Sequence, residues 1–267
     1  MHIVVCVKQV PDPEAAFSML KVDEEAKTVV PPEGLRLVMS PFDEQALEAA
    51  LRVRESLGET TITAISVGPA ASRNVLKHAL AMGADEALLV SDPSLEDCAS
   101  ETAALALMHA VRSLGRVDLI LTGRQAADWD AGIAGCGIAE LMGLPVVTFA
   151  RRIEVKGETL IVERVLSDGF ETIEALLPAV VTVSNELGAA RTPSLRETMR
   201  AARKPLSVKS AADLGLATAD IERMAARRTR MRLYVPSKTV QCELVSGVDE
   251  AAQGAMLARR LREERLV

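Results

Sequence analysis

The stretch that decides the fold is VDLILTGRQAADWDAGIAGCGIAELMGLP, residues 117–145. Residues 117–121 form an apolar run that is too short for a helix and is typical of a fully buried strand. Small residues and glycines follow as far as Gly135, and residues 138–142 have the pattern of an amphipathic helix. A strand, a glycine turn and a helix N-terminus expose backbone N–H groups and a positive dipole end. This order predicts a seat for a phosphate or pyrophosphate, and a plain strand-to-helix turn remains the alternative.

Residues 1–150 continue this alternation of strands and helices. Apolar, β-rich runs are followed by helical patterns that open on capping residues and close on glycine. Such alternation predicts an α/β fold in which a parallel sheet carries helices on both faces. Ligands of such sheets lie beyond the carboxyl ends of the strands, where the loops after several strands meet. The expected strands are residues 2–7, 61–67, 86–90, 117–121 and 146–149, and the expected helices begin at Ser40, Ala71, Cys98 and within 128–138.

After Ala150 the pattern changes. Three runs separated by Lys156-Gly157 and Asp168-Gly169 predict antiparallel strands at 151–155, 160–165 and 170–176. A buried strand follows at 178–183, and residues 247–264 have the pattern of a charged helix. We therefore expect a nucleotide-binding α/β domain over residues 1–205, including the antiparallel insertion. Residues 206–267 are expected to form a C-terminal extension and an arm.

The composition excludes several classes of protein. The net charge of −6 argues against a nucleic-acid partner, and no apolar run approaches the ~20 residues of a membrane span. The first residues enter a strand without a signal-peptide pattern, so we expect a cytoplasmic location. The four cysteines share no metal-ligand spacing, and no histidine accompanies an activated Ser or Cys in the sequence. We predict neither a metal site nor a catalytic residue.

Six stretches of the chain, one of them within residues 117–145, resemble one known family, the β subunits of electron transfer flavoproteins. Their joint presence in this order is highly specific. The stretches are VVCVKQVPDP (4–13), MSPFDEQALEAALR (39–52), SVGPAASRNVLKHALAMGADEALLV (66–90), LILTGRQAADWD (119–130), VERVLSDGFETIEALLPAVVTV (162–183) and RTPSLRETMRAARK (191–204).

The resemblance implies an adenine-nucleotide-hydrolase-like fold that hydrolyses nothing, in an electron carrier rather than an enzyme. It implies a heterodimer with a larger α subunit, which holds most of the redox-active FAD while the β subunit closes over it. The β subunit itself holds AMP, or a second FAD in electron-bifurcating members that work in NADH-dependent complexes. Acyl-CoA dehydrogenases or other dehydrogenases are the implied transient partners.

The nucleotide site that the resemblance implies lies along the predicted strand edge, and this sequence departs from the family there. Ile133-Ala134 stands where the AMP type has Gln-Thr, and Trp129 replaces a glycine or an acid. CASETAA, residues 98–104, matches the bifurcating pattern only in part. AMP is favoured, and a second FAD stays open. The implied site residues are Cys6, Val7, Ser40, Pro41, Phe42, Val67, Gly68, Gly123, Gln125, Asp128, Ile133, Ala134 and Gly135.

A second implied site is the loop that anchors the client dehydrogenase, with Arg191, Pro193, Leu195 and Arg196 as candidates. Leu195 is a large apolar residue between polar neighbours, which predicts an exposed side chain. Pro193 stiffens the loop and lowers the entropy that docking costs. The alternative is that Leu195 packs on the chain's own core.

Two other classes of function are alternatives to an electron carrier. An enzyme of adenine-nucleotide chemistry would need a glycine-rich phosphate loop or a nucleophile with its base, and the sequence shows neither. A nucleotide-sensing binding module would need neither the antiparallel insertion nor the basic segment 191–204. The electron carrier explains both.

Overall fold

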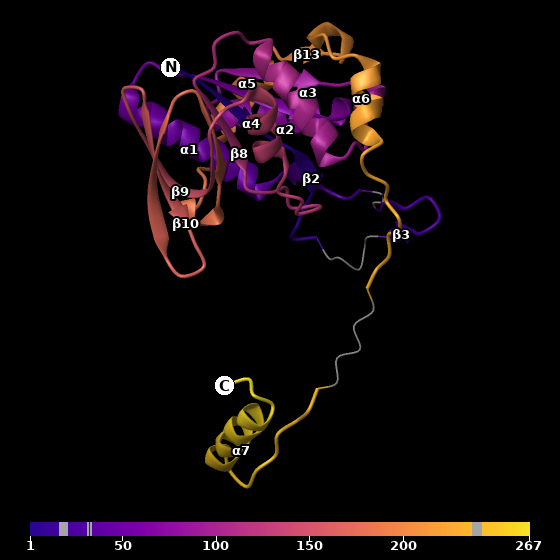
Figure 1. Cartoon of the computed structure of the whole chain (residues 1–267), viewed down its shortest axis with the longest axis vertical. Coiled ribbons are helices and arrows are strands. Elements are labelled where there is room, and N and C mark those ends of the chain that lie inside the picture. Colours follow the sequence, from indigo (N-terminus) through magenta and orange to yellow (C-terminus); the bar gives the residue numbers. More distant parts are fainter. Residues whose placement is uncertain (16–20, 31, 33, 237–241) are drawn as a thin grey trace. The chain divides into compact units, whose positions relative to one another are not determined.

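The computed structural model describes residues 1–15, 21–30, 32, 34–236 and 242–267 (Figure 1). They form two compact units, Met1–Lys21 with Val29–Met231 and Val22–Thr28 with Arg232–Val267. The first unit continues past residue 205, because residues 207–225 pair with its sheet and pack on its core. The arm predicted for residues 206–267 stays a prediction. Among the described residues, no helix is long and apolar enough to cross a membrane.

The first unit is built on a nine-stranded sheet with the order β11-β10-β9-β12-β8-β1-β6-β7-β13. All neighbours from β9 to β13 are parallel, and β10 and β11 extend the sheet antiparallel. The strands are β1 His2–Cys6, β6 Thr61–Val67, β7 Glu86–Val90, β8 Leu119–Gly123, β9 Val146–Lys156, β10 Thr159–Val165, β11 Phe170–Leu176, β12 Ala179–Val183 and β13 Ser207–Lys209. Two-stranded sheets join β2 Gln9–Pro11 to β5 Leu37–Met39, and β3 Lys21–Asp23 to β4 Thr28–Val30.

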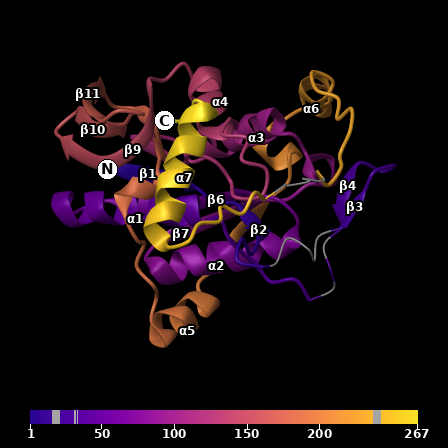
Figure 2. The same cartoon turned by 90° about the horizontal axis from the view of Figure 1, so that it is seen from below.

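Helices cover both faces of this sheet, as predicted (Figure 2). Helices α1 Pro41–Leu57 and α2 Arg73–Met82 lie on one face. Helices α3 Ser100–Arg112 and α4 Ala134–Met142 lie on the other, joined by α6 Thr218–Ala225. Helix α5 Leu195–Arg203 contacts α2, and α7 Glu250–Glu263 belongs to the second unit. Short 3-10 turns are η2 Ala70–Ser72, η3 Pro93–Leu95, η4 Asn185–Leu187 and η5 Ala212–Leu214.

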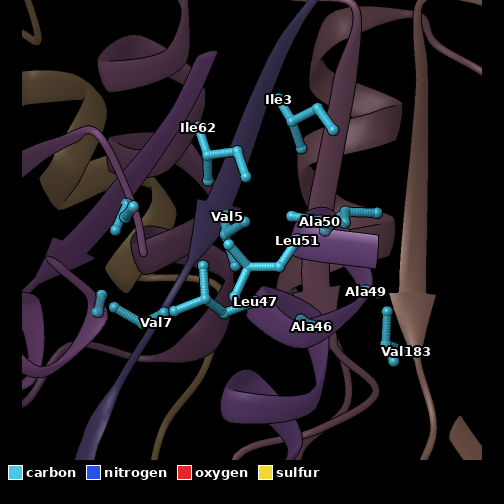
Figure 3. Packing of buried hydrophobic residues seen from close by; sticks show 14 of the residues in the cluster. Ile3, Val5, Val7, Ala46, Leu47, Ala49, Ala50, Leu51, Ile62 and Val183 are labelled. Atoms are coloured by element: carbon cyan, nitrogen blue, oxygen red, sulfur yellow. The ribbon is translucent and has the colours of Figure 1, made fainter. Parts of the chain in front are cut away.

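The core explains why the parallel strands read as continuous apolar runs. Alternate residues of β1 point to opposite faces, so Val5 packs against α1 and Val4 against α3. Figure 3 shows Leu47 and Leu51 of α1 lying beside Val5. Both leucines are fully buried, so they form an apolar stripe that packs this helix on the sheet.

Strand β9 corrects one detail of the prediction, which divided it into two strands. It runs unbroken, parallel to β12 in its first half and antiparallel to β10 in its second. The strand changes from parallel to antiparallel pairing at Phe149. This residue has a φ of 59°, and the register of β9 with β12 shifts beside it. The Phe149 N–H donates to Thr182 Oγ1 at 3.0 Å instead of to a strand carbonyl. A bulge of this kind bends a strand without ending it.

The segment 191–204, predicted to be a loop, contains helix α5. Ser194 caps it: the Glu197 N–H donates to Ser194 Oγ at 3.3 Å, and the Ser194 N–H donates to Glu197 Oε2 at 2.7 Å. This reciprocal capping box was present in the sequence as Ser-x-x-Glu. Leu195 is therefore the first residue of a helix.

Candidate functional site

The strand order reverses between β1 and β8. The chain passes from β1 to β6 and β7 on one side, and α3 then returns it to β8 on the other. In parallel α/β sheets a ligand site forms beyond the carboxyl ends of the strands at such a reversal. Cys6 ends β1 in register with Thr122 of β8, and Gly123 follows as the last residue of that strand. We call this place the β1–β8 edge, and Cys6, Val7 and Gly123 lie there.

Ser40 joins the two sides of the β1–β8 edge. Its N–H donates to Lys8 O at 3.0 Å, and its Oγ accepts the Ala127 N–H at 3.3 Å. The sequence predicts Ser40 as the N-cap of α1, and it holds that position, with Pro41 as the first helical residue. Its hydroxyl, however, makes no cap hydrogen bond, because it serves the loop after β8 instead.

Asp43 ties the backbone of this edge together, and sequence analysis missed it. Its carboxylate accepts the Lys8 N–H at 2.8 Å and the Gly123 N–H at 3.0 Å, and the residue is only 6% exposed. A Cβ added at Gly123 would lie 2.6 Å from Asp43 Oδ1, so this strand end must be glycine. Burial raises the pKa of the Asp43 carboxyl to about 7, against the lowering effect of the two backbone hydrogen bonds and of Lys8.

The loop after β8 carries the polar side chains predicted for the site. Lys8 Nζ lies 2.6 Å from Asp128 Oδ2, an ion pair that links the segment after β1 to this loop. Gln125 Nε2 donates to Asp130 Oδ1 at 2.7 Å. Both predicted residues are thus present at the edge with partners of their own, and Lys8 joins them as a cation.

Helix α4 presents an uncapped N-terminus. It begins at Ala134, earlier than the pattern of residues 138–142 indicates, and Ile133 in the N-cap position has no side-chain bond to it. The first N–H groups of a helix have no partner within it. Gly135 has a packing reason of its own, since a Cβ there would lie 2.6 Å from Thr122 Oγ1. The presence of glycine at this position is therefore no evidence for a ligand.

The remaining predicted residues lie around this centre. Phe42 follows Pro41 in α1, and the Arg124 guanidinium lies 4.8 Å from the centre of its ring. Val67 ends β6, on the side of β1 away from β8, and the Gly68 N–H donates to Val90 O at 3.0 Å. A Cβ at Gly68 would meet Ser72 Oγ at 2.6 Å, so packing explains this glycine too.

Two open hollows of the surface lie elsewhere. One of about 590 Å³ is lined by α1 and β9, with Arg52, Arg151 and Glu163 among its residues. Another of about 800 Å³ lies at the amino ends of the strands, beside His2 and Asp118. Neither contains a residue of the predicted nucleotide site, and the description of the β1–β8 edge rests on topology and hydrogen bonding.

Replacing Asp43 by Asn should flatten the pH dependence of stability. The pKa in the folded state is above the ordinary value of 3.8, so the folded chain binds more protons between these values. The free energy of unfolding of the wild type therefore falls as the pH rises through this window. Going from about pH 5 to about pH 8, the variant should gain on the order of 2 kcal/mol relative to wild type.

Urea unfolding at both pH values measures this effect, with Asp168→Asn in an exposed hairpin turn as the matched control. Lys8, Asp128 and the Cys6 thiol face Asp43 and are unchanged in both variants. Identical pH profiles for wild type and Asp43→Asn would contradict the assignment of a raised pKa to Asp43.

The predicted docking residues divide into two groups. Leu195 is 77% exposed, which confirms the predicted exposure and rejects packing on the chain's own core. Arg196 is exposed as well, and Pro193 is partly buried. Arg191 instead is ion-paired with α1: its Nε lies 2.7 Å from Glu48 Oε2 and its NH1 2.7 Å from Glu55 Oε1. A contact of any of these residues with a partner stays a prediction.

Comparisons with known proteins agree with the sequence resemblance. Residues 28–214 match the family model described as the electron transfer flavoprotein domain. The electron transfer flavoprotein subunit beta of Thermoanaerobacterium thermosaccharolyticum is 35% identical over 269 residues, covering all of both chains. The Caffeyl-CoA reductase-Etf complex subunit CarD of Acetobacterium woodii is 32% identical over all of both chains. Protein FixA of Azorhizobium caulinodans is 30% identical over 99% of this chain and 95% of its own.

The family model matches more than half of the chain, and the relatives are similar to it over nearly its full length. The chain therefore belongs to the electron transfer flavoprotein family, as a member of its β subunits.

Proposed function

We propose that this chain is the β subunit of a heterodimeric electron carrier and holds an adenine nucleotide at the β1–β8 edge. FAD, carried mainly by the α subunit, supplies the redox chemistry when bound. The observation that carries the proposal is the construction of this edge: Asp43 fixes the N–H groups of Lys8 and Gly123 beside the uncapped N-terminus of α4. The N–H groups of the first turn of α4 are donors held in place by the fold, and such donors at a helix N-terminus suit a phosphate.

The groups at the edge fit the two halves of a nucleoside monophosphate. The first-turn N–H groups of α4 and the Lys8 ammonium suit the phosphate, because both are donors. Asp128 and Asp130 are carboxylates, which accept hydrogen bonds from ribose hydroxyls. The negative charge of Asp128 is balanced by Lys8, and Asp130 accepts a hydrogen bond from the neutral amide of Gln125.

AMP is the proposed nucleotide, and a second FAD is the alternative. Ile133 and Ala134 offer no polar side chain, so this chain must hold a phosphate there through backbone donors. The alternative draws on the relatives, because one of similar identity is named a subunit of a caffeyl-CoA reductase-Etf complex. That alternative would make this chain part of an electron-bifurcating assembly.

The antiparallel strands supply a surface suited to the α subunit. Large apolar side chains are exposed on β9 and β11 and in the turn between β10 and β11, although such residues are usually buried. An exposed apolar patch marks an interaction site. The exposed side chains are Val146, Phe149, Leu166, Phe170 and Leu176.

Counting the nucleotides in the heterodimer tests the proposal. The chain is co-purified with its α subunit and denatured, and the released nucleotides are identified by mass and counted per heterodimer. One FAD and one AMP are expected. Two FAD per heterodimer would select the alternative, and one FAD without any second nucleotide would contradict a nucleotide site in this chain.

A further inference from the structure

The chain's single tryptophan, Trp129, is held at the nucleotide edge with its indole half-exposed. It lies in the loop between β8 and α4 and is 46% exposed. The Arg230 guanidinium lies 5.1 Å from the centre of the indole ring, and Arg230 NH1 lies 3.5 Å from Asp97 Oδ2. Asp97 precedes α3 in the loop after β7. Two loops at the carboxyl edge of the sheet and the segment after α6 therefore meet at this ring.

The backbone of Trp129 is tied to the centre of the edge. Its N–H donates to Asp128 Oδ1 at 2.9 Å, while the other oxygen of Asp128 binds Lys8 Nζ at 2.6 Å. A second arginine of the segment after α6, Arg228, binds both carboxylate oxygens of Glu101 at 3.1 Å, in the first turn of α3. The backbone of Trp129 is thus tied to the Lys8–Asp128 pair, and the segment that carries Arg230 is tied to α3.

We propose that Trp129, with Arg230 over its ring, is the wall against which the planar base of the adenine nucleotide stacks. This inference rests on the nucleotide site proposed above and names the residue that selects for the base. An indole offers one N–H donor and a large aromatic face, and that face is suited to a planar ring. Bases stack on aromatic side chains. Truncating such a side chain to alanine costs about 1–3 kcal/mol of binding free energy, which is roughly 5- to 150-fold in affinity.

The chemistry of the edge favours the base over other occupants. Phosphate donors lie at α4 and Lys8, and the carboxylates suited to a ribose lie in the same loop as Trp129. Trp129 stands between the carboxylates Asp128 and Asp130 in the sequence, so a base carried by a ribose at these carboxylates would lie next to the indole. The Arg230 cation polarises the indole ring through a cation–π contact, which strengthens the ring as a stacking surface.

Equilibrium dialysis of the heterodimer against labelled AMP tests this wall. Trp129→Ala should weaken AMP binding about tenfold, and Trp129→Phe, which keeps an aromatic face, should bind within about threefold of wild type. Binding of ribose 5-phosphate, measured by competition, should be the same in all three proteins. Leu57→Ala is the matched control, because Leu57 is also an exposed large apolar side chain, 40% exposed at the end of α1, outside both proposed sites.

Each outcome decides one claim. Equal AMP affinity in wild type and Trp129→Ala overturns the wall, as does an equal loss for AMP and ribose 5-phosphate, which would make Trp129 a support of the loop. A loss confined to FAD, measured in parallel, would assign the indole to the flavin ring and overturn the assignment to adenine. Failure of the wild type to bind either nucleotide would instead contradict the proposed nucleotide site itself.

Discussion

Leu195→Ala should slow electron transfer from a dehydrogenase to the flavin by at least about tenfold, with flavin content and melting temperature nearly unchanged. The side chain is 77% exposed at the first position of α5, so its removal leaves no cavity in this chain. A single anchor in a small interface costs about 2 kcal/mol or more when truncated. Met199, one turn later and 58% exposed, continues the same apolar stripe.

Stopped-flow bleaching of the heterodimer by a substrate-reduced acyl-CoA dehydrogenase measures this transfer. Because the loss is one of docking, the rate should recover as the dehydrogenase concentration is raised. Leu57→Ala is the matched control, since Leu57 is 40% exposed at the end of α1 and belongs to neither proposed interface. A lowered melting temperature with normal transfer would show that Leu195 supports the fold and that docking lies elsewhere.

Arg191→Met should destabilise the chain by about 2 kcal/mol, a discounted value because Arg191 itself is partly exposed. Its guanidinium donates to both oxygens of Glu48, at 2.7 and 3.1 Å, and to Glu55. The Glu48 side chain is only 6% exposed, so losing Arg191 leaves a buried carboxylate with Arg52 as its remaining cation. Arg191 thereby holds the segment leading into α5 against α1.

The same pair gives this destabilisation a pH dependence of known sign. Burial raises the pKa of Glu48, but hydrogen bonds from Arg191 and Arg52 outweigh it and hold the pKa below 4.5. A depressed pKa contributes stability that is present above the unfolded value and lost as the pH falls through the folded value. The difference between wild type and Arg191→Met in urea unfolding should therefore shrink in acid.

Arg196→Met separates the anchoring of the segment from docking. Arg196 is exposed and follows Leu195 in α5, whereas Arg191 lies before this helix. We expect normal stability and slower transfer for Arg196→Met, and reduced stability for Arg191→Met. Normal stability of Arg191→Met together with slow transfer would show that Arg191 is a docking residue, as the resemblance implies.

The sheet was predictable because burial on both faces leaves a direct trace in sequence. Strand β8 is buried throughout, and so the short apolar run at 117–121 could only be a core strand. Its exact bounds, Leu119–Gly123, depend on register: Asp118 is used as an acceptor for the His2 N–H, and Gly123 pairs with Val183. Register is a property of the assembled sheet and leaves no local signal.

The candidate site was predictable in its backbone and not in its side chains. The rule for parallel sheets places Cys6 and Gly123 at one edge from the alternation of elements alone. Asp43 was missed because an acid in the first turn of a helix is ordinarily a solvent-exposed partner of the dipole. Only the neighbouring strand ends reveal that its two oxygens bridge the Lys8 and Gly123 N–H groups.

Long-range contacts account for the other differences. Arg191 looks like an exposed basic residue in sequence, and its partners Glu48 and Glu55 lie more than a hundred residues earlier in the chain. In sequence, Trp129 is only a departure from the family pattern. Its contact with Arg230, about a hundred residues later in the chain, exists only in the folded structure. In contrast, the Ser194–Glu197 capping box is local, and the sequence contained the information that α5 begins there.

The visible absorption spectrum of the chain co-expressed and co-purified with an electron transfer flavoprotein α subunit tests the central claim most directly. We expect a yellow heterodimer with flavin absorption that is bleached when a substrate-reduced dehydrogenase is added. A colourless complex that binds adenine nucleotide would contradict an electron-carrier role for this chain and favour a nucleotide-sensing module.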